Sequence, residues 1–316
     1  MSTGILSILT FSLLPDQNKT LAFEKFKTIL SLILAVSLVE YPMIILGLIH
    51  SIGNIEPFSE IKISRGQFYI NYIFNIVLND QHLLISGFSF FRFSSIFDEP
   101  GLIGSISAIL FFSYPDNKRA KSQTIEKSIF LISVILSFSL GGYLLFIIGT
   151  LINFILGESK NKIKKMIILV AFICIGLVSL SSTEGGKAYI TDRIWSKNNI
   201  TLNKNNRVDD NFDKEYYTIY DSPIDFLIGK GKDAHTRTGF DVSSYKGFIY
   251  NYGLVGISLI IIIFLYILIT KKVTIGAYVI PILLLINSFQ RPIEFIFYYY
   301  FIFLSIICYY EKNKKP

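Results

Sequence analysis

Long apolar runs separated by short charged segments dominate this chain. Five runs approach the roughly 20 residues that cross the hydrocarbon core of a bilayer, at 28–50, 166–182, 248–270, 273–289 and 292–310. Shorter apolar runs lie at 3–14, 101–114 and 125–157. The composition agrees, with 52% hydrophobic residues and a mean hydropathy of +0.51. The sequence therefore predicts an all-α polytopic membrane protein with about 7–8 transmembrane or re-entrant helices, in a single membrane domain over 1–316.

The distribution of basic residues predicts which loops face the cytoplasm. Segments rich in Lys and Arg carry a net charge of +10 together, and they lie at 15–27, 115–127, 158–165, 271–272 and 311–316. The rest of the chain carries −3. By the positive-inside rule the basic set is cytoplasmic, so 51–100 and the larger loop 183–247 are extracytoplasmic. The overall charge of +7 is thus a topological signal, and it gives no support to nucleic acid as a partner.

This topology depends on the run 125–157. Basic residues flank both of its ends, and Ser139-Leu140-Gly141-Gly142-Tyr143 lies in its middle. Two short or re-entrant helices that enter and return would keep both flanks cytoplasmic. The alternative, one long tilted helix, would place Lys271 and Lys272 outside. We expect the helical hairpin.

The extracytoplasmic segment 51–100 combines an aromatic stretch with a charged turn. Aromatic and polar residues alternate over 66–91, which predicts an amphipathic helix at the membrane interface. The turn that follows runs from Arg92 to Gly101 and places Asp98-Glu99 directly before Pro100. Because a proline disfavours helical geometry in the residue before it, this turn should open the next apolar helix.

One carboxylate, Glu40, falls inside an apolar run. A charged group at that depth costs about 2.5 kcal/mol or more, so it normally faces the interior of a helix bundle. Two interpretations carry equal weight, a functional group and a structural hydrogen-bond acceptor.

Arginine and lysine are distributed differently. Six of the seven arginines are predicted to lie outside, namely Arg65, Arg92, Arg193, Arg207, Arg237 and Arg291. Lysine dominates the cytoplasmic segments. The planar guanidinium group can hold phosphate oxygens in a bidentate manner, which favours an anionic substrate at the outer face. Arg193 and Arg207, in Lys- and Asn-rich sequence, are interpreted as ordinary loop residues.

The loop 183–247 changes character along its length. Residues 191–218 are rich in Asn, Lys and Asp and predict a solvated, mobile segment. A more apolar stretch follows and ends in Gly229-Lys230-Gly231, and His235-Thr236-Arg237 comes a few residues later. The amides of such a glycine-rich turn are candidates to cradle an anion.

No metal site or cofactor is predicted. The two cysteines, Cys174 and Cys308, lie in separate apolar runs and are interpreted as packing residues. The three histidines, His50, His82 and His235, are far apart in the sequence. No metal-binding spacing of His, Cys, Asp or Glu is present.

Two segments resemble a known family. Arg92 to Gly104, which reads R-x-S-S-I-F-D-E-P-G-x-x-G, resembles the signature of bacterial O-antigen polymerases and related polysaccharide polymerases of the O-antigen ligase-like superfamily. The second segment joins Gly229-Lys230-Gly231 to Ser244-Tyr245 and to Tyr252-Gly253-Leu254-Val255-Gly256, which is similar to the end of that family's large periplasmic loop. Together they cover about half of the chain, in the same order and on the same predicted side.

The chain also departs from that family. Its members usually have ten or more membrane helices, so the resemblance implies a chain that is short at its N-terminus. Leu140 stands where the family commonly has an arginine after a serine. Any role of that arginine cannot be carried over.

The resemblance implies a metal-independent glycosyl transfer at the outer face of the bacterial cytoplasmic membrane. The growing glycan would pass from its undecaprenyl-diphosphate carrier to another lipid-linked oligosaccharide. Cations must stabilise the lipid diphosphate that leaves, and Arg92 and Arg237 are the first candidates. Glu99 or His235 could accept the proton of the acceptor hydroxyl, and Glu99 could instead orient Arg92. Substrate contacts are expected from Arg65, Lys230, Tyr245, Lys246 and Arg291.

Two alternatives remain open at this point. A ligase that moves the finished glycan onto lipid A-core would use the same donor. A non-catalytic transporter or binding protein for lipid-linked sugars would instead need polar residues along its helices, and the apolar runs carry few. A polymerase implies a flippase and a chain-length regulator as partner proteins.

Overall fold

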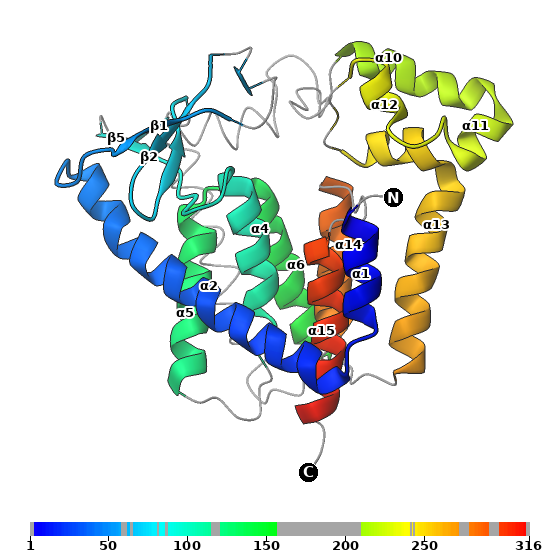
Figure 1. Cartoon of the computed structure of the whole chain (residues 1–316). Helices are drawn as coiled ribbons and strands as arrows, with labels where there is room; N and C mark the ends of the chain where they lie inside the picture. Colours follow the sequence, from blue (N-terminus) through cyan, green and yellow to red (C-terminus); the bar gives the residue numbers. More distant parts are fainter. Residues whose placement is uncertain are drawn as a thin grey trace. The chain divides into compact units, whose positions relative to one another are not determined.

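The computed structural model describes residues 3–57, 62–63, 66–80, 82–85, 88–114, 121–156, 210–240, 242, 244–271, 278–290 and 297–313 (Figure 1). Most of the described residues are helical, as the apolar runs predict, but five short strands among them show that the fold is not all-α. The chain divides into two compact units. The central unit is Glu24–Lys204, and the terminal unit combines Met1–Phe23 with Asn205–Pro316.

The central unit is built around a group of three helices. Helix α4 (Pro100–Phe111) packs against both α5 (Lys121–Leu136) and α6 (Leu140–Leu156). Three residues separate α5 from α6, and the middle one, Phe138, has a left-handed φ of 45°. The prediction that the run 125–157 forms two helices is therefore confirmed, and the single long helix is excluded. Helix α4 begins at Pro100, as the charged turn predicts.

Small residues bring α4 close to α6. A Cβ atom added to Gly104 would lie 2.6 Å from Ser137 Oγ and 2.9 Å from Ser139 Cβ. One added to Gly142 would lie 2.9 Å from the carbonyl carbon of Gly104. These separations are shorter than normal van der Waals contacts, so a larger side chain would force the helices apart. The last glycine of the Arg92–Gly104 segment is thus a packing residue.

The stretch 66–91 forms strands where it is described, so the predicted interfacial helix is wrong. Strands β1 (Gly53–Ile55), β2 (Tyr69–Asn71) and β3 (Ile76–Leu78) make an antiparallel sheet in that order. A second antiparallel pair joins β4 (His82–Ile85) to β5 (Phe88–Phe91). Aromatic and β-branched residues favour strands when the turn between them is held in place. Helix α2 (Asp16–Ile45), which continues into the central unit, holds the turn between β2 and β3.

Glu40 of α2 holds the turn between β2 and β3. Its buried carboxylate accepts hydrogen bonds from the amides of Ile73 and Phe74, at 3.0 and 2.8 Å, and from Asn75 Nδ2 at 2.8 Å. Asn75 Nδ2 also donates to the carbonyl oxygen of Ser37. These contacts support the structural interpretation of Glu40, because they use the carboxylate to order a tight turn.

The terminal unit places a small helical region at the start of a long helix. The region contains α10 (Asp210–Tyr217), the short 3-10 helix η2 (Thr218–Asp221), α11 (Pro223–Ile228) and α12 (Ala234–Arg237). Both α11 and α12 pack against α13 (Tyr245–Thr270). Helix α14 (Val279–Gln290) contacts α13 and α15 (Phe297–Asn313), and α1 (Thr3–Ser12) packs against α15.

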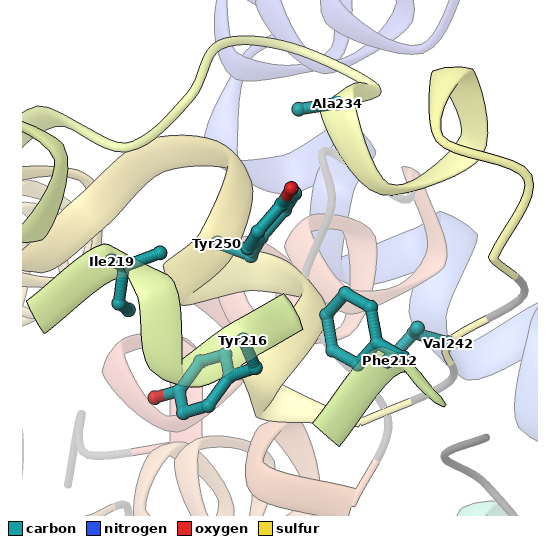
Figure 2. Close-up of a cluster of buried hydrophobic side chains, with 6 residues drawn as sticks. All are labelled: Phe212, Tyr216, Ile219, Ala234, Val242 and Tyr250. Atoms are coloured by element: carbon teal, nitrogen blue, oxygen red, sulfur yellow. The ribbon is translucent and has the colours of Figure 1, made fainter. Parts of the chain in front are cut away.

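A cluster of buried apolar side chains holds this helical region together, as Figure 2 shows. Its members come from α10, η2, α12, α13 and the loop before α13: Phe212, Tyr216, Ile219, Ala234, Val242 and Tyr250. The prediction of a mobile segment over 191–218 is therefore wrong for 210–218. Phe212 and Tyr216 lie four residues apart, so one face of α10 is apolar despite its many charges. Residues 191–209 lie outside the described part of the chain.

Two of the described helices, α2 and α13, are long and apolar enough to cross a membrane by length and composition. The apolar helices α4, α6, α14 and α15 are shorter, with 10–17 residues. The 12 residues of α4 rise by about 18 Å, which is less than the roughly 30 Å hydrocarbon core. The apolar run 166–182 lies outside the described residues. The described helices thus establish a mostly helical fold with two long apolar helices.

Candidate functional site

Two glycine turns of the terminal unit fit against each other. Helix α13 is kinked at Gly253, which has φ 62° and ψ −168°, and Gly229 after α11 has φ 73°. A Cβ atom on Gly253 would lie 2.3 Å from the carbonyl oxygen of Leu227. One on Gly229 would lie 2.4 Å from the carbonyl carbon of Asn251. Both positions require glycine, because the backbone is left-handed and the chains touch.

Main-chain hydrogen bonds join the same two turns. The amides of Lys230 and Gly231 donate to the carbonyl oxygens of Tyr250 and Asn251, at 2.8 and 2.9 Å. The kink about two turns into α13 leaves these carbonyls available for partners outside the helix. The expected anion cradle at Gly229–Gly231 is therefore not formed, since its amides are bonded to protein carbonyls. The two turns make a rigid frame instead, which we call the glycine frame.

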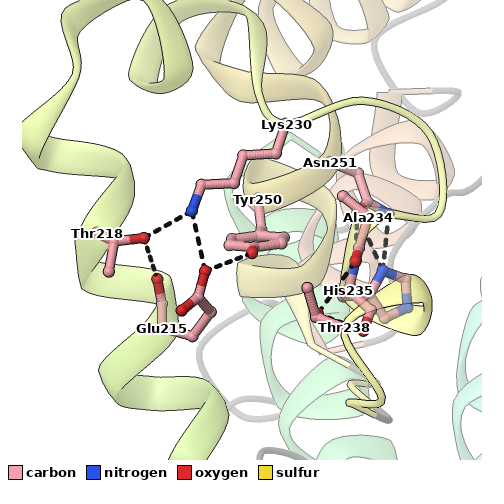
Figure 3. Close-up of polar contacts among 8 residues, drawn as sticks. All are labelled: Glu215, Thr218, Lys230, Ala234, His235, Thr238, Tyr250 and Asn251. Carbon is pink, nitrogen blue, oxygen red and sulfur yellow. Dashed lines mark hydrogen bonds and ion pairs between the residues drawn. The ribbon is translucent and has the colours of Figure 1, made fainter.

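An ion pair fastens α10 to this frame (Figure 3). Lys230 Nζ donates to Glu215 Oε1 at 2.9 Å and to Thr218 Oγ1 at 2.7 Å. The hydroxyl of Tyr250 donates to the same carboxylate oxygen at 2.7 Å. Lys230, expected to contact substrate, is thus held by protein groups in this structure.

The titration of this pair reflects its contacts. Hydrogen bonds from Lys230 and then from Tyr250 lower the pKa of Glu215 below its ordinary value. Burial acts to lower the pKa of Lys230, but the contacts with Glu215 and Tyr250 together outweigh it and the net shift is upward. Both groups are therefore charged at neutral pH, and the pair fixes α10 electrostatically.

Lys246 and Tyr245 begin α13 and have different surroundings. Lys246 Nζ lies 2.8 Å from Asp213 Oδ1 and about 5 Å from the ring centres of Tyr216 and Tyr217. Tyr245 is exposed, and its ring packs edge-on, at 64°, to an aromatic ring of α14. It also lines a cavity of about 160 Å³ between α13 and α14, with other walls from Phe248, Ile257, Ile261, Leu285 and Phe289.

His235 is buried against α13. Its backbone amide donates to Asn251 Oδ1 at 3.2 Å, and its Nδ1 lies 2.8 Å from Asn251 Nδ2 and 3.0 Å from Oδ1. On the other side of the ring, Nε2 lies 3.3 Å from Thr236 Oγ1. Figure 3 shows the imidazole and the Asn251 amide facing each other. The ring is therefore fixed by two elements and presents Nε2 next to an exposed residue.

Arg237 follows on the same short helix and is exposed. Its Nη2 reaches the carbonyl oxygen of Lys230 at 3.5 Å, a long and weak contact. The guanidinium group thus lies beside the glycine frame with most of its donors directed to the surface. The terminal unit brings Lys230, His235 and Arg237 onto one frame.

In the central unit, Arg92 is buried. Its Nε donates to the carbonyl oxygen of Ser137 at 3.1 Å, directly after the end of α5. The amide of the next residue, Phe93, donates to the carbonyl oxygen of Leu136 at 3.0 Å. Ser94 donates its hydroxyl to the carbonyl oxygen of Ile76 in β3. These bonds join the turn to the end of a helix and to a strand, which gives Arg92 a structural contact.

Glu99 forms an ion pair with Lys62, a residue that the sequence did not single out. Lys62 Nζ lies 3.5 Å from Glu99 Oε1 and 3.8 Å from Asp98 Oδ2, and it donates to the Tyr69 hydroxyl at 2.9 Å. Burial acts to lower the pKa of Lys62, but Tyr69 and the two carboxylates raise it overall. About a third of the Glu99 side chain is exposed, so the carboxylate is held and still reaches solvent.

Two expected substrate contacts, Arg65 and Arg291, lie outside the described residues. Within the described ranges, no three His, Cys, Asp or Glu side chains gather where they could hold a metal ion. The expected residues thus fall in separate places: Arg92 and Glu99 in the central unit, and Lys230, His235, Arg237, Tyr245 and Lys246 in the terminal unit.

Sequence reasoning missed two polar residues of the terminal unit. Asn251 contacts His235, and Glu215 contacts Lys230. An asparagine within the first two turns of an apolar helix is a weak signal that could have pointed to the first. Nothing distinguishes Glu215 from the other charges around it, because its role depends on a partner 15 residues further along the chain.

Comparisons with protein-family models, with curated proteins and with solved structures gave no match to this chain.

Proposed function

We propose that this chain is a membrane glycosyltransferase that polymerises undecaprenyl-diphosphate-linked oligosaccharide repeat units at the outer face of a bacterial cytoplasmic membrane. The observation that carries the proposal is the glycine frame. Gly229–Gly231 and Gly253 belong to two separate parts of the segment that resembles polysaccharide polymerases, and they pack directly against each other. This contact gives a physical reason for the two parts to occur together.

The membrane setting is part of the same proposal. Helix α13 starts at the frame, and only 17% of its most apolar window is buried within the protein. A helix so apolar and so little covered is suited to a lipid environment. With the charge distribution of the loops, this supports an arrangement with several membrane crossings and with 51–100 and 183–247 outside.

In the proposed reaction, the bond between the sugar and the lipid diphosphate breaks while the acceptor hydroxyl bonds to the same anomeric carbon. The bonding electrons leave with the diphosphate, which gains negative charge. Arg237 is the proposed stabilising cation because it is exposed and lies on a rigid frame. The proton of the acceptor hydroxyl passes to water at the outer face. Arg92, being bonded to the end of α5, is proposed to brace the turn that carries Glu99.

The test is deletion of the gene in its own strain, complementation, and gel analysis of the surface glycan. Loss of the ladder down to one repeat unit on the lipid core is the expected result. Uncapped core would indicate a ligase instead, and an unchanged glycan would overturn the proposal. Accumulation of lipid-linked units at the cytoplasmic face would indicate transport.

Complementation with Arg237→Gln sharpens this test. Removing one well-placed donor costs roughly 10²–10³ in rate, so the ladder should disappear. Lys232→Gln is the matched control, since this exposed cation lies on the turn before α12 and pairs only loosely with Asp233 at 3.8 Å. Normal ladders from Arg237→Gln would remove the proposed role of Arg237.

A further inference from the structure

The contact between His235 and Asn251 constrains where the imidazole carries its proton. Asn251 is fully buried, so the N–H groups of its amide need partners within the protein. Its Oδ1 accepts the backbone amide of His235 at 3.2 Å, which fixes the orientation of the side chain. With that orientation, Nδ2 lies 2.8 Å from the imidazole Nδ1.

Nδ1 of His235 lies 2.8 Å from the amide nitrogen of Asn251, which is only a donor, and 3.0 Å from Oδ1, which is only an acceptor. Oδ1 already accepts the backbone amide of His235, so the shorter contact, in which Nδ1 offers its lone pair, satisfies both ends of the Asn251 amide. In a neutral imidazole the single proton then lies on Nε2. Nε2 faces Thr236 Oγ1 at 3.3 Å, a long contact next to an exposed residue, and a stronger acceptor could displace it.

We infer that Asn251 is a positioning residue that holds neutral His235 as the Nε2–H tautomer, so that His235 acts as a hydrogen-bond donor to an oxygen of the substrate diphosphate. The role toward substrate rests on the proposed function, whereas the tautomer does not. His235 therefore donates a hydrogen bond to the diphosphate, and it does not remove the proton from the acceptor hydroxyl. A donor of this kind adds to the stabilisation that Arg237 offers to the leaving diphosphate.

The surroundings of the imidazole bear on its protonation. In the described part of the terminal unit, Lys232, Asp233 and Arg237 lie on α12 or the turn before it. Helix α13, which packs against α12, contributes Lys246, and that cation is paired with Asp213. The direct partner of Nδ1 is the uncharged Asn251.

The tautomer can be measured without activity. The chain has three histidines, so His50→Gln and His82→Gln leave His235 as the only imidazole in protein labelled with ¹⁵N-histidine and purified in detergent. At pH 7.5 the ¹⁵N NMR shifts should report a protonated Nε2 and an unprotonated Nδ1. A protonated Nδ1, alone or together with Nε2, would overturn the inference whether or not the protein is a polymerase.

The role toward substrate is tested with Asn251→Asp, because a carboxylate accepts a proton from Nδ1 and so moves the single proton of the neutral ring away from Nε2. At wild-type protein levels, chain extension should fall about 10²-fold while the ¹⁵N shifts of His235 report an unprotonated Nε2. Undiminished chain extension by a variant whose shifts report an unprotonated Nε2 would overturn the positioning role.

If the wild-type gene has no effect on the glycan ladder, the proposed function fails while the NMR result still decides the tautomer.

Discussion

The two segments that resemble polysaccharide polymerases differ in what their polar groups contact. In the central unit, Arg92 and Ser94 bond to main-chain carbonyls, and Gly104 packs against Ser137 and Ser139. In the terminal unit, glycines and main-chain amides make the frame, while the guanidinium group of Arg237 stays exposed. The first segment therefore uses its arginine for the fold. The second builds its fold from the backbone and leaves side chains available for chemistry.

The difference teaches how a shared motif should be interpreted. An arginine in a motif suggests anion binding, but a buried arginine bonded to a helix end stabilises a junction as well. A glycine pair in a motif suggests a phosphate loop, but here its amides are paired with carbonyls. The exposed charged groups beside such a frame are then the better candidates for contact with substrate.

The largest effect is expected from adding a methyl group inside the glycine frame. Gly253→Ala should destabilise the terminal unit by about 3 kcal/mol, since it combines a left-handed backbone with a clash against Leu227. Thermal unfolding in detergent measures this. Gly239→Ala is the matched control, because Gly239 also has a positive φ, 83°, but has open space around it. Its cost should be about 1 kcal/mol. Equal losses from the two variants would contradict a close-packed frame.

A smaller effect should arise in the central unit, where side-chain bonds carry the fold. Glu40→Gln replaces one acceptor oxygen by a donor that faces an N–H group, and it should cost about 2 kcal/mol. Denaturant unfolding followed by far-UV circular dichroism measures this loss of stability. Val39→Ala, on the exposed side of the same helix, should change stability by less than about 0.5 kcal/mol. If Glu40→Gln behaves like this control, the turn between β2 and β3 does not depend on the carboxylate.

The smallest effect concerns the ion pair that fastens α10 to the frame. Because the pKa of Glu215 is lowered in the folded protein, the carboxylate stabilises the fold above its ordinary value, and this contribution is lost as the pH falls through the lowered value. Glu215 is about one third exposed, so solvent screening limits the contribution to less than about 1 kcal/mol. The stability difference between wild type and Glu215→Gln should therefore shrink on acidification below about pH 4.5. Asp221→Asn, at an exposed position after α10, is the control, and a difference that stays constant with pH would contradict the ion-pair account.

The sequence predicted the apolar helices, because long apolar runs leave little choice of structure, but it did not predict α10, α11 and α12. It also predicted the division of 125–157, since charges at both ends and small residues in the middle fit two helices better than one. It failed at 66–91, where the strands depend on Glu40, a residue more than 30 positions away. Local alternation of aromatic and polar residues cannot reveal such a partner.

The candidate site was predicted only in outline. His235 and Arg237 could be selected as polar residues after a glycine turn, but the partner of His235 lies in the next helix. The sequence suggested that the amides of Lys230 and Gly231 were free to bind an anion. In the folded chain, the kink at Gly253 exposes two carbonyl groups of α13, and these amides bond to them. Side-chain roles that depend on two segments meeting need the structure.

The central claim is that Arg237 serves chemistry while Arg92 serves the fold. The most direct measurement is glycan transfer per folded molecule, by purified Arg237→Gln and Arg92→Gln proteins supplied with lipid-linked repeat units in liposomes, together with the unfolding temperature of each. Arg237→Gln should lose roughly 10²-fold or more in transfer with an unchanged unfolding temperature. Arg92→Gln should unfold at lower temperature, with a free-energy loss of about 2 kcal/mol, and keep transfer within a few-fold of wild type. The reverse result, stable but inactive Arg92→Gln and active Arg237→Gln, would contradict the account.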